Sequence, residues 1–598
     1  MDNQKSSILR TVRFLLRYMI RCRLLTLLCV LCVLLTSLSE IAAPYLLRPI
    51  INNYIPAGDT HALLTAVFLL GMLYLLGVVC SYASSRLMIR ISQKTIHAIR
   101  ADLFRKLQVL PVSWLDSQPH GRLMSCFTGD IDTISDALNT AMNNILSGFI
   151  TFVGVIVMMI VMNPLLTLIS FCFLVCMYFI VKVSGGKSRF YFRKQQQHLG
   201  ALNGFIQEIL AGEKVVRVTG HEEAAVDDFD RLNQGLSEST NSAQIFSGSV
   251  MPALGGTASI NTAVSCCIGA VFVILGRMDL GSLVAYSQYL RQAGRPVATV
   301  SVQFNLLMAA AAGTERIMAV MDMEPECDSR HYRLERTSTD SARSCWTDRS
   351  KRIPLRAEVA FENVSFCYTP DVPVLTDLSF RAASGQKIAL VGSTGAGKTT
   401  VLNLLTRFYE PSAGTITIDG IPISDIEKAS LRQSFSTVLQ DTHLFTGSIR
   451  DNIRFGRLDA SDAEVEDAAR LAGADFFISH LPEGYDTVIT ADGASLSAGQ
   501  RQLISIARAA IAAPAMLLLD EATASVDTWT EHQIEQGLDR LMKDRTVFII
   551  AHRLSTVRNA DCILVLEHGQ ILERGTHAEL LALKGRYYQL YTGQVELS

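Results

Sequence analysis

The hydrophobic and polar positions divide the chain into two parts of different character. Up to about residue 323 the sequence carries long apolar runs, whereas the remainder alternates short apolar runs with polar segments, as in a soluble α/β protein. An apolar run of about 20 residues is long enough to cross a bilayer as a helix. We therefore predict six membrane spans, at about Leu24 to Leu47, Leu63 to Ser84, Ile145 to Met162, Leu165 to Val183, Met251 to Leu275 and Leu283 to Ala312.

The connections between the spans predict their orientation. Those after spans one, three and five are short and contain Arg277 as their single fully charged cation, whereas those after spans two and four are long and rich in Lys and Arg. The positive-inside rule then places the long connections and both termini in the cytoplasm. Within the long connections, Ile89 to Val109 and Phe192 to Leu210 keep a helical apolar period, so the membrane helices should continue roughly 30 Å further. We expect short turns at Pro111 to Pro119 and at Leu210 to Lys214.

The segment before the first span predicts a helix at the membrane surface. Within Ile8 to Met19 and just beyond it, arginines recur at helical spacing on one face and apolar residues fill another. Such a helix lies against membrane lipid. The first apolar run is too long for a cleaved signal peptide, so we expect it to be retained.

A loss of periodicity marks the boundary between the two parts. We predict an interfacial helix at 1–23, a transmembrane domain at 24–323, a polar linker at 324–356 and a nucleotide-binding domain at 357–598. The formal net charge of -2 says little about partners, and we expect no nucleic-acid partner.

A glycine-rich segment in the second part predicts a phosphate site. Gly392 to Thr399 reads G-S-T-G-A-G-K-T between the apolar run Ile388 to Val391 and a helical pattern from Val401. Glycines let backbone N–H groups approach phosphates, and a helix N-terminus adds partial positive charge. In this pattern Lys398 reaches the β and γ phosphates and the Thr399 hydroxyl binds Mg²⁺.

Four further polar residues follow apolar strand-like runs. They are Gln440, Asp520, Glu521 and His552. Because ligands of parallel sheets bind at the carboxyl ends of the strands, we expect these side chains to converge on the glycine loop. A phosphate cradle, carboxylates, an amide and an imidazole suit Mg²⁺-dependent hydrolysis of a phosphoanhydride.

The order of these motifs resembles the ABC transporters, and within them exporters that fuse six membrane helices to one nucleotide-binding domain. The resemblance implies ATP and Mg²⁺ as cofactors, Glu521 as general base, His552 as the switch histidine on the γ-phosphate, and Gln440 as a sensor of Mg²⁺. It implies that Asp520 acts on Mg²⁺ through water. It also implies a nucleotide site made of Tyr368 on adenine, Gly392, Ser393, Thr394, Gly395, Ala396, Gly397, Lys398, Thr399 and Thr400 of the Walker A motif, Ser497, Gly499 and Gln500 of the signature loop, and Asp527 of the D-loop.

In that family the signature loop of one subunit closes over the P-loop of another, which implies a dimer with a second half-transporter subunit. The sequence departs from the family's usual motifs at two places, and these departures bear on the identity of the partner subunit. The signature reads Ser-Ala-Gly instead of Ser-Gly-Gly, which leaves Ser497 and Gly499 able to meet a γ-phosphate. The segment Val488 to Gly493, which contains Ala491-Asp492, stands where many homodimeric exporters have a Glu-containing Gly-Glu-Arg-Gly segment. The chain thus resembles the catalytically complete subunit of bacterial heterodimeric exporters. We favour a heterodimer, with a homodimer as the alternative.

Three charged residues fall within the predicted spans. Glu40 lies in the first, and Arg291 and Arg295 lie one turn apart in the sixth. Charges inside membranes usually face a bundle interior or a watery cavity, which makes these residues candidates for a substrate path. The structural alternatives are that Glu40 pairs with an arginine, or that Arg295 helps to satisfy a helix broken at Pro296.

The leading hypothesis is an ATP-driven exporter of a small amphipathic substrate in the bacterial plasma (inner) membrane, with cytoplasmic nucleotide domain and termini. A channel or regulator gated by ATP is disfavoured because Glu521 and His552 are both present. An importer of a metal chelate with the same fold stays open. A soluble ABC ATPase is excluded by the six predicted spans.

Overall fold

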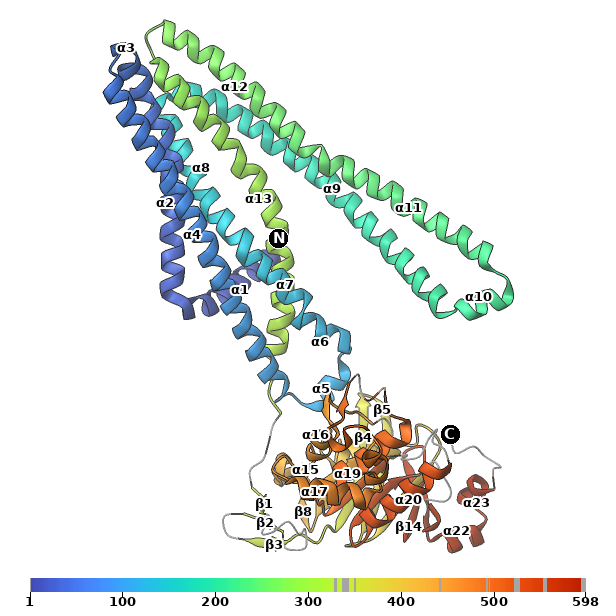
Figure 1. Cartoon of the computed structure of the whole chain (residues 1–598). Helices are drawn as coiled ribbons and strands as arrows, with labels where there is room; N and C mark the ends of the chain where they lie inside the picture. Colours follow the sequence, from blue (N-terminus) through green and yellow to red (C-terminus); the bar gives the residue numbers. More distant parts are fainter. Residues whose placement is uncertain are drawn as a thin grey trace. The chain divides into compact units, whose positions relative to one another are not determined.

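The chain forms two compact units (Figure 1). Unit one comprises Met1–Val109 and Gln118–Glu324, and unit two comprises Leu110–Ser117 and Pro325–Ser598. The computed structural model describes residues 2–326, 328, 331–335, 344–348, 351–439, 442–490, 493, 495–520, 528–551 and 557–592.

Unit one is built of helices, several of them very long. Helices α4 and α9 each run for 48 residues, or roughly 70 Å, so the predicted membrane helices do continue beyond their apolar spans. The helices are α1 (Asp2–Met19), α2 (Arg23–Pro49), α3 (Ile55–Ala57), α4 (Thr60–Leu107), α6 (His120–Phe127), α7 (Gly129–Asp136), α8 (Asn143–Met162), α9 (Pro164–Ala211), α10 (Glu213–Thr219), α11 (Glu222–Gly248), α12 (Val250–Ile274) and α13 (Leu280–Met321).

Five helical stretches in the described part of the chain are long and apolar enough to cross a membrane. They are Arg10–Tyr54, Thr60–Leu107, His120–Met162, Pro164–Ala211 and Glu222–Ile274. The sixth predicted span lies within α13, which is helical throughout but is not among these five, so this span stays a prediction.

The three short connections between predicted spans share one capping device. In each, an Asp or Asn side chain accepts a hydrogen bond from the backbone N–H three residues later, at the start of the next long helix. Asp59 caps α4, Asn163 caps α9 and Asp279 caps α13. The capping side chains explain why these connections are short and end sharply.

Asp279 also joins its turn to the end of α2. Arg48 donates from Nε and Nη2 to Asp279 Oδ2 at 3.1 and 2.7 Å, and Asn52 Nδ2 donates to Oδ1 at 2.5 Å. Burial alone would raise the pKa of Asp279, but hydrogen bonds from Asn52, Ser282 and Arg48 outweigh it and lower this pKa to about 2. We call Arg48, Asn52 and Asp279 the clasp.

Helices α9 and α11 lie side by side as a long hairpin whose turn is near α10 (Figure 1). The rings of Tyr191 and Phe246 stack with centroids 5.3 Å apart, and Lys187 Nζ lies 5.3 Å from the Phe246 ring. The predicted turn at Leu210 to Lys214 is confirmed, because α9 ends at Ala211 and α10 begins at Glu213.

Unit two is built on a sheet with both faces covered. Five parallel strands and one antiparallel edge strand have the order β15 (Gln570–Gly575), β14 (Cys562–Glu567), β6 (Lys387–Gly392), β13 (Thr546–Ile550), β12 (Met516–Asp520), β9 (Phe435–Val438). Alternate residues of the central strands enter two different apolar clusters, one of them shared with α17 (Asp462–Ala472) and α19 (Ala498–Ile511). Burial on both faces explains why these strands read as continuous apolar runs.

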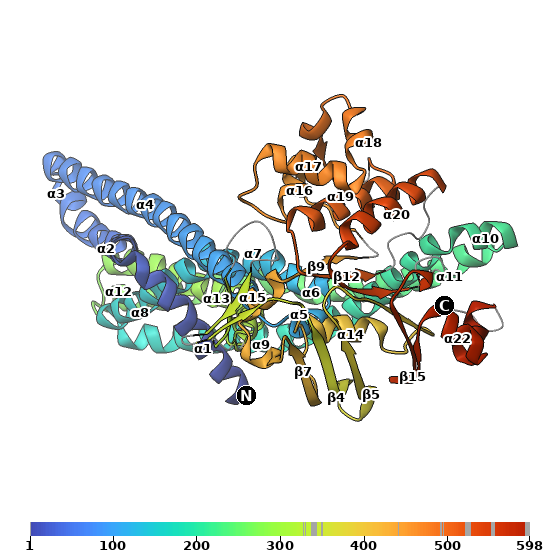
Figure 2. The same ribbon diagram turned by 90° about the horizontal axis from the view of Figure 1, so that it is seen from below.

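The second cluster is shared with a four-stranded antiparallel sheet, in the order β5 (Val372–Ala382), β4 (Val359–Thr369), β7 (Ala413–Ile418), β8 (Ile421–Pro422). Figure 2 shows helices α16 (Ile449–Arg454), α17 and α19 on one side of unit two and β4, β5 and β7 on the other. Unit two therefore has two cores, separated by the parallel sheet.

The predicted linker contains a small antiparallel sheet in its described part. The strands are β1 (Arg333–Glu335), β2 (Cys345–Thr347) and β3 (Arg352–Pro354). Trp346 of β2 is fully buried, and its indole N–H donates to Asp419 Oδ2 at 3.0 Å. This segment therefore adds structure to unit two, because one buried aromatic ring anchors an otherwise polar stretch.

Candidate functional site

Four neighbouring strands of the large sheet end at one edge. Strands β6, β13, β12 and β9 run parallel and adjacent in that order. Leu390 of β6 is level with Ile550 of β13, which is level with Asp520 of β12. The ends of these strands therefore lie side by side, and Asp520 stands at the same edge as the glycine loop. The convergence of the side chains that follow the strands stays a prediction.

Several predicted site residues lie outside the described residues. They are Gln440, Glu521, Asp527 and His552, together with Ala491 and Asp492 of the altered segment before the signature loop. Their roles stay predictions. The strands that precede Gln440, Glu521 and His552 are nevertheless described, and their ends are neighbours in the sheet.

The glycine loop joins β6 to α14 (Lys398–Leu405) and requires glycine where the chain turns. Gly395 has φ +81° and Gly397 has φ +99°, in the left-handed region that disfavours other residues. A Cβ at Gly397 would lie 2.5 Å from Leu375 Cδ2 and 3.3 Å from the Val374 carbonyl oxygen. The loop is thus packed closely against β5, which leaves room only for glycine.

The first three residues of α14 differ in their exposure to solvent. Lys398 is buried, and its Nζ donates to the carbonyl oxygens of Gly392 at 2.5 Å and Ser393 at 3.2 Å. Thr399 is exposed at the start of α14, whereas Thr400 is buried. A cation against a glycine loop at a helix N-terminus fits a phosphate chain, and the exposed Thr399 hydroxyl fits a Mg²⁺ ligand.

Tyr368, the residue expected to stack on adenine, is held next to this loop. Its hydroxyl lies 3.2 Å from Thr400 Oγ1 and accepts a hydrogen bond from Asn403 Nδ2 at 3.2 Å. The Phe366 and Tyr409 rings meet it edge to face, with centroids 4.8 and 5.0 Å away. The ring is anchored on these sides yet remains 46% exposed, which fits a stacking surface.

The signature loop ends in a capping box at α19. Ser497 Oγ accepts from the Gln500 N–H at 3.2 Å, and Gln500 Oε1 accepts from the Ser497 N–H at 2.9 Å. Gly499 is buried. The side chains of Ser497 and Gln500 therefore cap the N-terminus of α19. The backbone N–H groups at a helix N-terminus attract an anion.

Residues that the sequence did not single out connect this site to α5 (Val112–Ser117). The Tyr409 hydroxyl donates to Asp116 Oδ2 at 3.0 Å, and both residues belong to unit two. Burial and the hydrogen bond to Asp116 raise the pKa of Tyr409 to about 12. Asp116, Tyr409, Tyr368 and Thr400 thus form a chain of contacts from α5 to the helix that follows the glycine loop. No local pattern marks Tyr409, because its partner lies 293 residues away.

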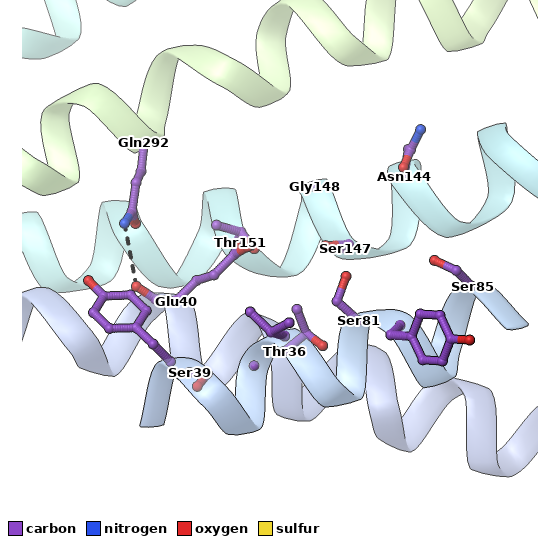
Figure 3. Close-up of a pocket in the computed structure, with 14 residues that line it drawn as sticks. Thr36, Ser39, Glu40, Ser81, Ser85, Asn144, Ser147, Gly148, Thr151 and Gln292 are labelled. Carbon is purple, nitrogen blue, oxygen red and sulfur yellow. Dashed lines mark hydrogen bonds between the residues drawn. The ribbon is translucent and has the colours of Figure 1, made fainter. Parts of the chain in front are cut away.

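Unit one contains a polar cavity of about 900 Å³ between α2, α4, α8 and α13 (Figure 3). Glu40 lines it, and its Oε2 accepts from Thr151 Oγ1 at 3.3 Å. Arg291 is exposed and is not among the lining residues, and the side chain of Arg295 lies outside the described part. The lining residues are Thr36, Ser39, Glu40, Tyr74, Gly77, Val78, Ser81, Tyr82, Ser85, Asn144, Ser147, Gly148, Thr151 and Gln292.

Two families match the two parts of the chain. Residues 26–297 match the ABC transporter transmembrane region, and residues 375–524 match the ABC transporter family.

Known proteins resemble the chain over most of its length. The "Uncharacterized ABC transporter ATP-binding protein YfiC" of Bacillus subtilis (strain 168) is 40% identical over 98% of this chain and 94% of its own. The "Fatty acid ABC transporter ATP-binding/permease protein" of Mycobacterium bovis is 40% identical over 87% of this chain and 79% of its own. A solved structure described as "Structure of a bacterial Atm1-family ABC exporter with ATP bound" matches with TM-score 0.77 and 27% identity, over 96% of this chain and 98% of that one.

Proposed function

Because this chain belongs to the ABC transporter family and has its exporter fold, we propose that it is one half of an ATP-driven exporter in the bacterial plasma membrane. Its substrate would be amphipathic, lipid-like, drug-like or a peptide, moved by alternating access. The observation that carries the ATPase part is the common edge reached by β6, β13, β12 and β9, at which the glycine loop begins and β12 ends in Asp520.

The described residues divide the work of holding ATP and Mg²⁺. Lys398 and the glycine loop would bind phosphates, Thr399 and Asp520 would hold Mg²⁺, directly and through water respectively, and Tyr368 would stack on adenine. Bound Mg²⁺ would neutralise charge that develops on the phosphates during hydrolysis. Lys398 is already directed at the loop by the carbonyls of Gly392 and Ser393, so it needs little rearrangement to meet a phosphate.

The roles proposed for the remaining site residues rest on sequence order. Glu521 would act as general base on the attacking water, His552 would contact the γ-phosphate, and Gln440 would sense Mg²⁺. Each follows a strand of the common edge directly or within two residues. The neighbouring strand ends support this assignment, because side chains that follow them begin from adjacent positions.

Half-transporters of this family work as dimers, and we propose a heterodimer for this chain. Ser497 and Gly499 would close over the glycine loop of the partner subunit, with Asp527 near that interface. The Ala491-Asp492 segment supports a heterodimer, since it departs from the sequence common in homodimers. The mass of the purified complex after expression of this chain alone tests the point: an active dimer of this chain would establish a homodimer.

The orientation proposal places both termini and unit two in the cytoplasm. It is supported by the Lys and Arg residues of the two long connections, which belong to helical extensions of α4 and α9. Labelling with an impermeant reagent in intact cells tests it, with one cysteine introduced at Asp59 or at Glu213 in a chain whose own 13 cysteines have been replaced. Only the cysteine at position 59 should react.

The ATPase proposal is tested by Glu521→Gln. This change should leave ATP binding intact and lower turnover by roughly 10² to 10⁴, the usual contribution of a general base. Glu535→Gln is the matched control, because Glu535 is an exposed glutamate of α20 (Thr528–Met542). Normal turnover by the Glu521 variant would overturn the base assignment.

A further inference from the structure

The polar cavity of unit one has an unusual balance of chemistry. Eight of its 14 lining residues bear hydroxyl groups, and Glu40 is the only acidic or basic residue among all of them. Its volume of about 900 Å³ is in the range of small-molecule sites, roughly 300 to 1,000 Å³. The cavity is therefore large enough for an organic molecule and carries one negative group.

Glu40 is only weakly engaged by its surroundings. Its side chain is exposed to the cavity, and in the described part of the chain its carboxylate accepts a long 3.3 Å hydrogen bond from Thr151. Among the described side chains, no Lys, Arg or His forms an ion pair with it. A carboxylate between membrane helices is costly unless it has a partner or a function.

Gln292 presents a second acceptor from the opposite helix (Figure 3). Its Nε2 donates to the backbone oxygen of Glu40 at 3.5 Å. Its Oε1 is buried and has no hydrogen-bond partner in the described part of the chain. A buried acceptor without a donor is unfavourable, and an N–H group of a ligand would satisfy it. Glu40 on α2 and Gln292 on α13 thus lie at one end of the cavity. The Glu40 carboxylate is exposed there, and the buried Gln292 Oε1 becomes an acceptor for a ligand when its side chain turns into the cavity.

Aromatic and apolar residues of α4 line the same cavity. Tyr74 and Tyr82 are more than half exposed, and Val78 lies between them in sequence. Tyrosine faces attract cations and also contact alkyl chains. A fatty-acid anion is disfavoured, because its carboxylate would meet the like charge of Glu40.

From these contacts we infer that the cavity selects a cationic amphiphile whose ammonium group binds Glu40 and Gln292. This inference rests on the proposed function, because it names the class of substrate that the proposed exporter would carry. It sets this chain apart from the relative that is named for fatty acids.

The test is equilibrium binding of three twelve-carbon amphiphiles to the full chain in lipid nanodiscs, with empty nanodiscs subtracted. The probes are dodecylammonium, dodecanol and dodecanoate, which differ only in the head group. We expect dodecylammonium to bind tighter than dodecanoate by roughly tenfold or more, and Glu40→Gln to remove most of this preference. Dodecanol binding should change little.

Two variants separate charge from damage to the fold. Glu40→Asp keeps the carboxylate and should keep the preference for the ammonium, at reduced affinity. Glu213→Gln neutralises a carboxylate in the α10 turn, far along the sequence from the cavity lining, and should leave all three affinities unchanged. The inference is overturned if dodecanoate binds the wild type as tightly as dodecylammonium, or if Glu40→Gln leaves the preference intact. Because ATP is absent, such a result leaves the ATPase test with Glu521→Gln unaffected.

Discussion

The hydroxyl of Tyr409 donates a 3.0 Å hydrogen bond to Asp116, and this bond fastens α5 to the body of unit two. The segment Leu110–Ser117 precedes and follows residues of unit one along the chain, yet it is a part of unit two. The same tyrosine ring meets Tyr368 edge to face at 5.0 Å. A short helix from the first long connection is thereby joined, through two tyrosines, to the glycine-loop helix.

Loss of the Tyr409 hydroxyl should loosen α5. Tyr409→Phe keeps the ring contacts with Phe366 and Tyr368 but removes the hydrogen bond, worth about 1 to 2 kcal/mol. Amide hydrogen exchange across Val112–Ser117 should accelerate about tenfold. Asp116→Asn keeps an acceptor oxygen and should accelerate exchange less than Tyr409→Phe. Unchanged exchange in the phenylalanine variant would show that other contacts hold α5.

Gly397→Ala should impair ATP binding far more than Gly395→Ala. Both positions have left-handed φ values, so both substitutions strain the backbone by about 1 to 3 kcal/mol. At Gly397 the new Cβ would also lie 2.5 Å from Leu375 Cδ2, whereas at Gly395 nothing lies within 4 Å. Titration with a fluorescent ATP analogue compares the two affinities. Equal losses would mean that the contact with β5 contributes nothing to the shape of the loop.

Two matching capping boxes allow the proposed role of Ser497 at the γ-phosphate to be tested separately from its role in the fold. Ser497 and Gln500 cap α19 as Ser461 and Glu464 cap α17. Each serine-to-alanine change should cost about 1 kcal/mol of stability. Only Ser497→Ala should also reduce ATPase activity, by roughly tenfold or more, because its hydroxyl is proposed to meet a γ-phosphate. The comparison requires thermal unfolding and ATPase rates of both variants, and equal rates would contradict the proposed contact.

The clasp should make stability depend on pH in the acid range. The pKa of Asp279 is lowered from 3.8 to about 2 in the folded chain by hydrogen bonds from Asn52, Ser282 and Arg48, which overcome the opposing effect of burial. Its ionised form therefore stabilises the fold above about pH 4, and this contribution is lost as pH falls toward 2. Since the side chain is about one-third exposed, solvent screening reduces the effect to about 1 kcal/mol.

Thermal unfolding of wild type and Asp279→Asn between about pH 6 and pH 3 tests this expectation. The wild type should be the more stable at the upper end, and the difference should shrink as the pH is lowered. If the stability difference between wild type and Asp279→Asn stays constant with pH, the negative charge of Asp279 does not contribute to it.

Local pattern was sufficient to predict the elements whose neighbours are close in sequence. The helical period of Ile89 to Val109 anticipated the extension of α4, and the end of the helical period of Phe192 to Leu210 anticipated the turn near α10. The convergence of β6, β13, β12 and β9 followed from a general rule for parallel sheets. These features depend on periodicity or on a rule that holds for many sequences.

Features that depend on distant partners were missed. Strands β1 to β3 lie in a polar stretch with no apolar period, and they are anchored by Trp346, whose partner Asp419 is 73 residues away. The position of Gln292 likewise depends on a distant partner, because its Nε2 donates to the backbone oxygen of Glu40, 252 residues earlier. Neither contact can be predicted from the local sequence pattern, because the two segments come together only in the folded chain.

The clasp also limits how the helices of unit one can move. Arg48 and Asn52 hold the start of α13 to the end of α2, and nearby the Tyr289 hydroxyl of α13 donates to the Ile41 carbonyl at 2.6 Å. Helices joined at one end can separate only by rotating about that end. The clasp is therefore a pivot, and any opening between α2 and α13 must be widest at the end of α13 nearest Met321.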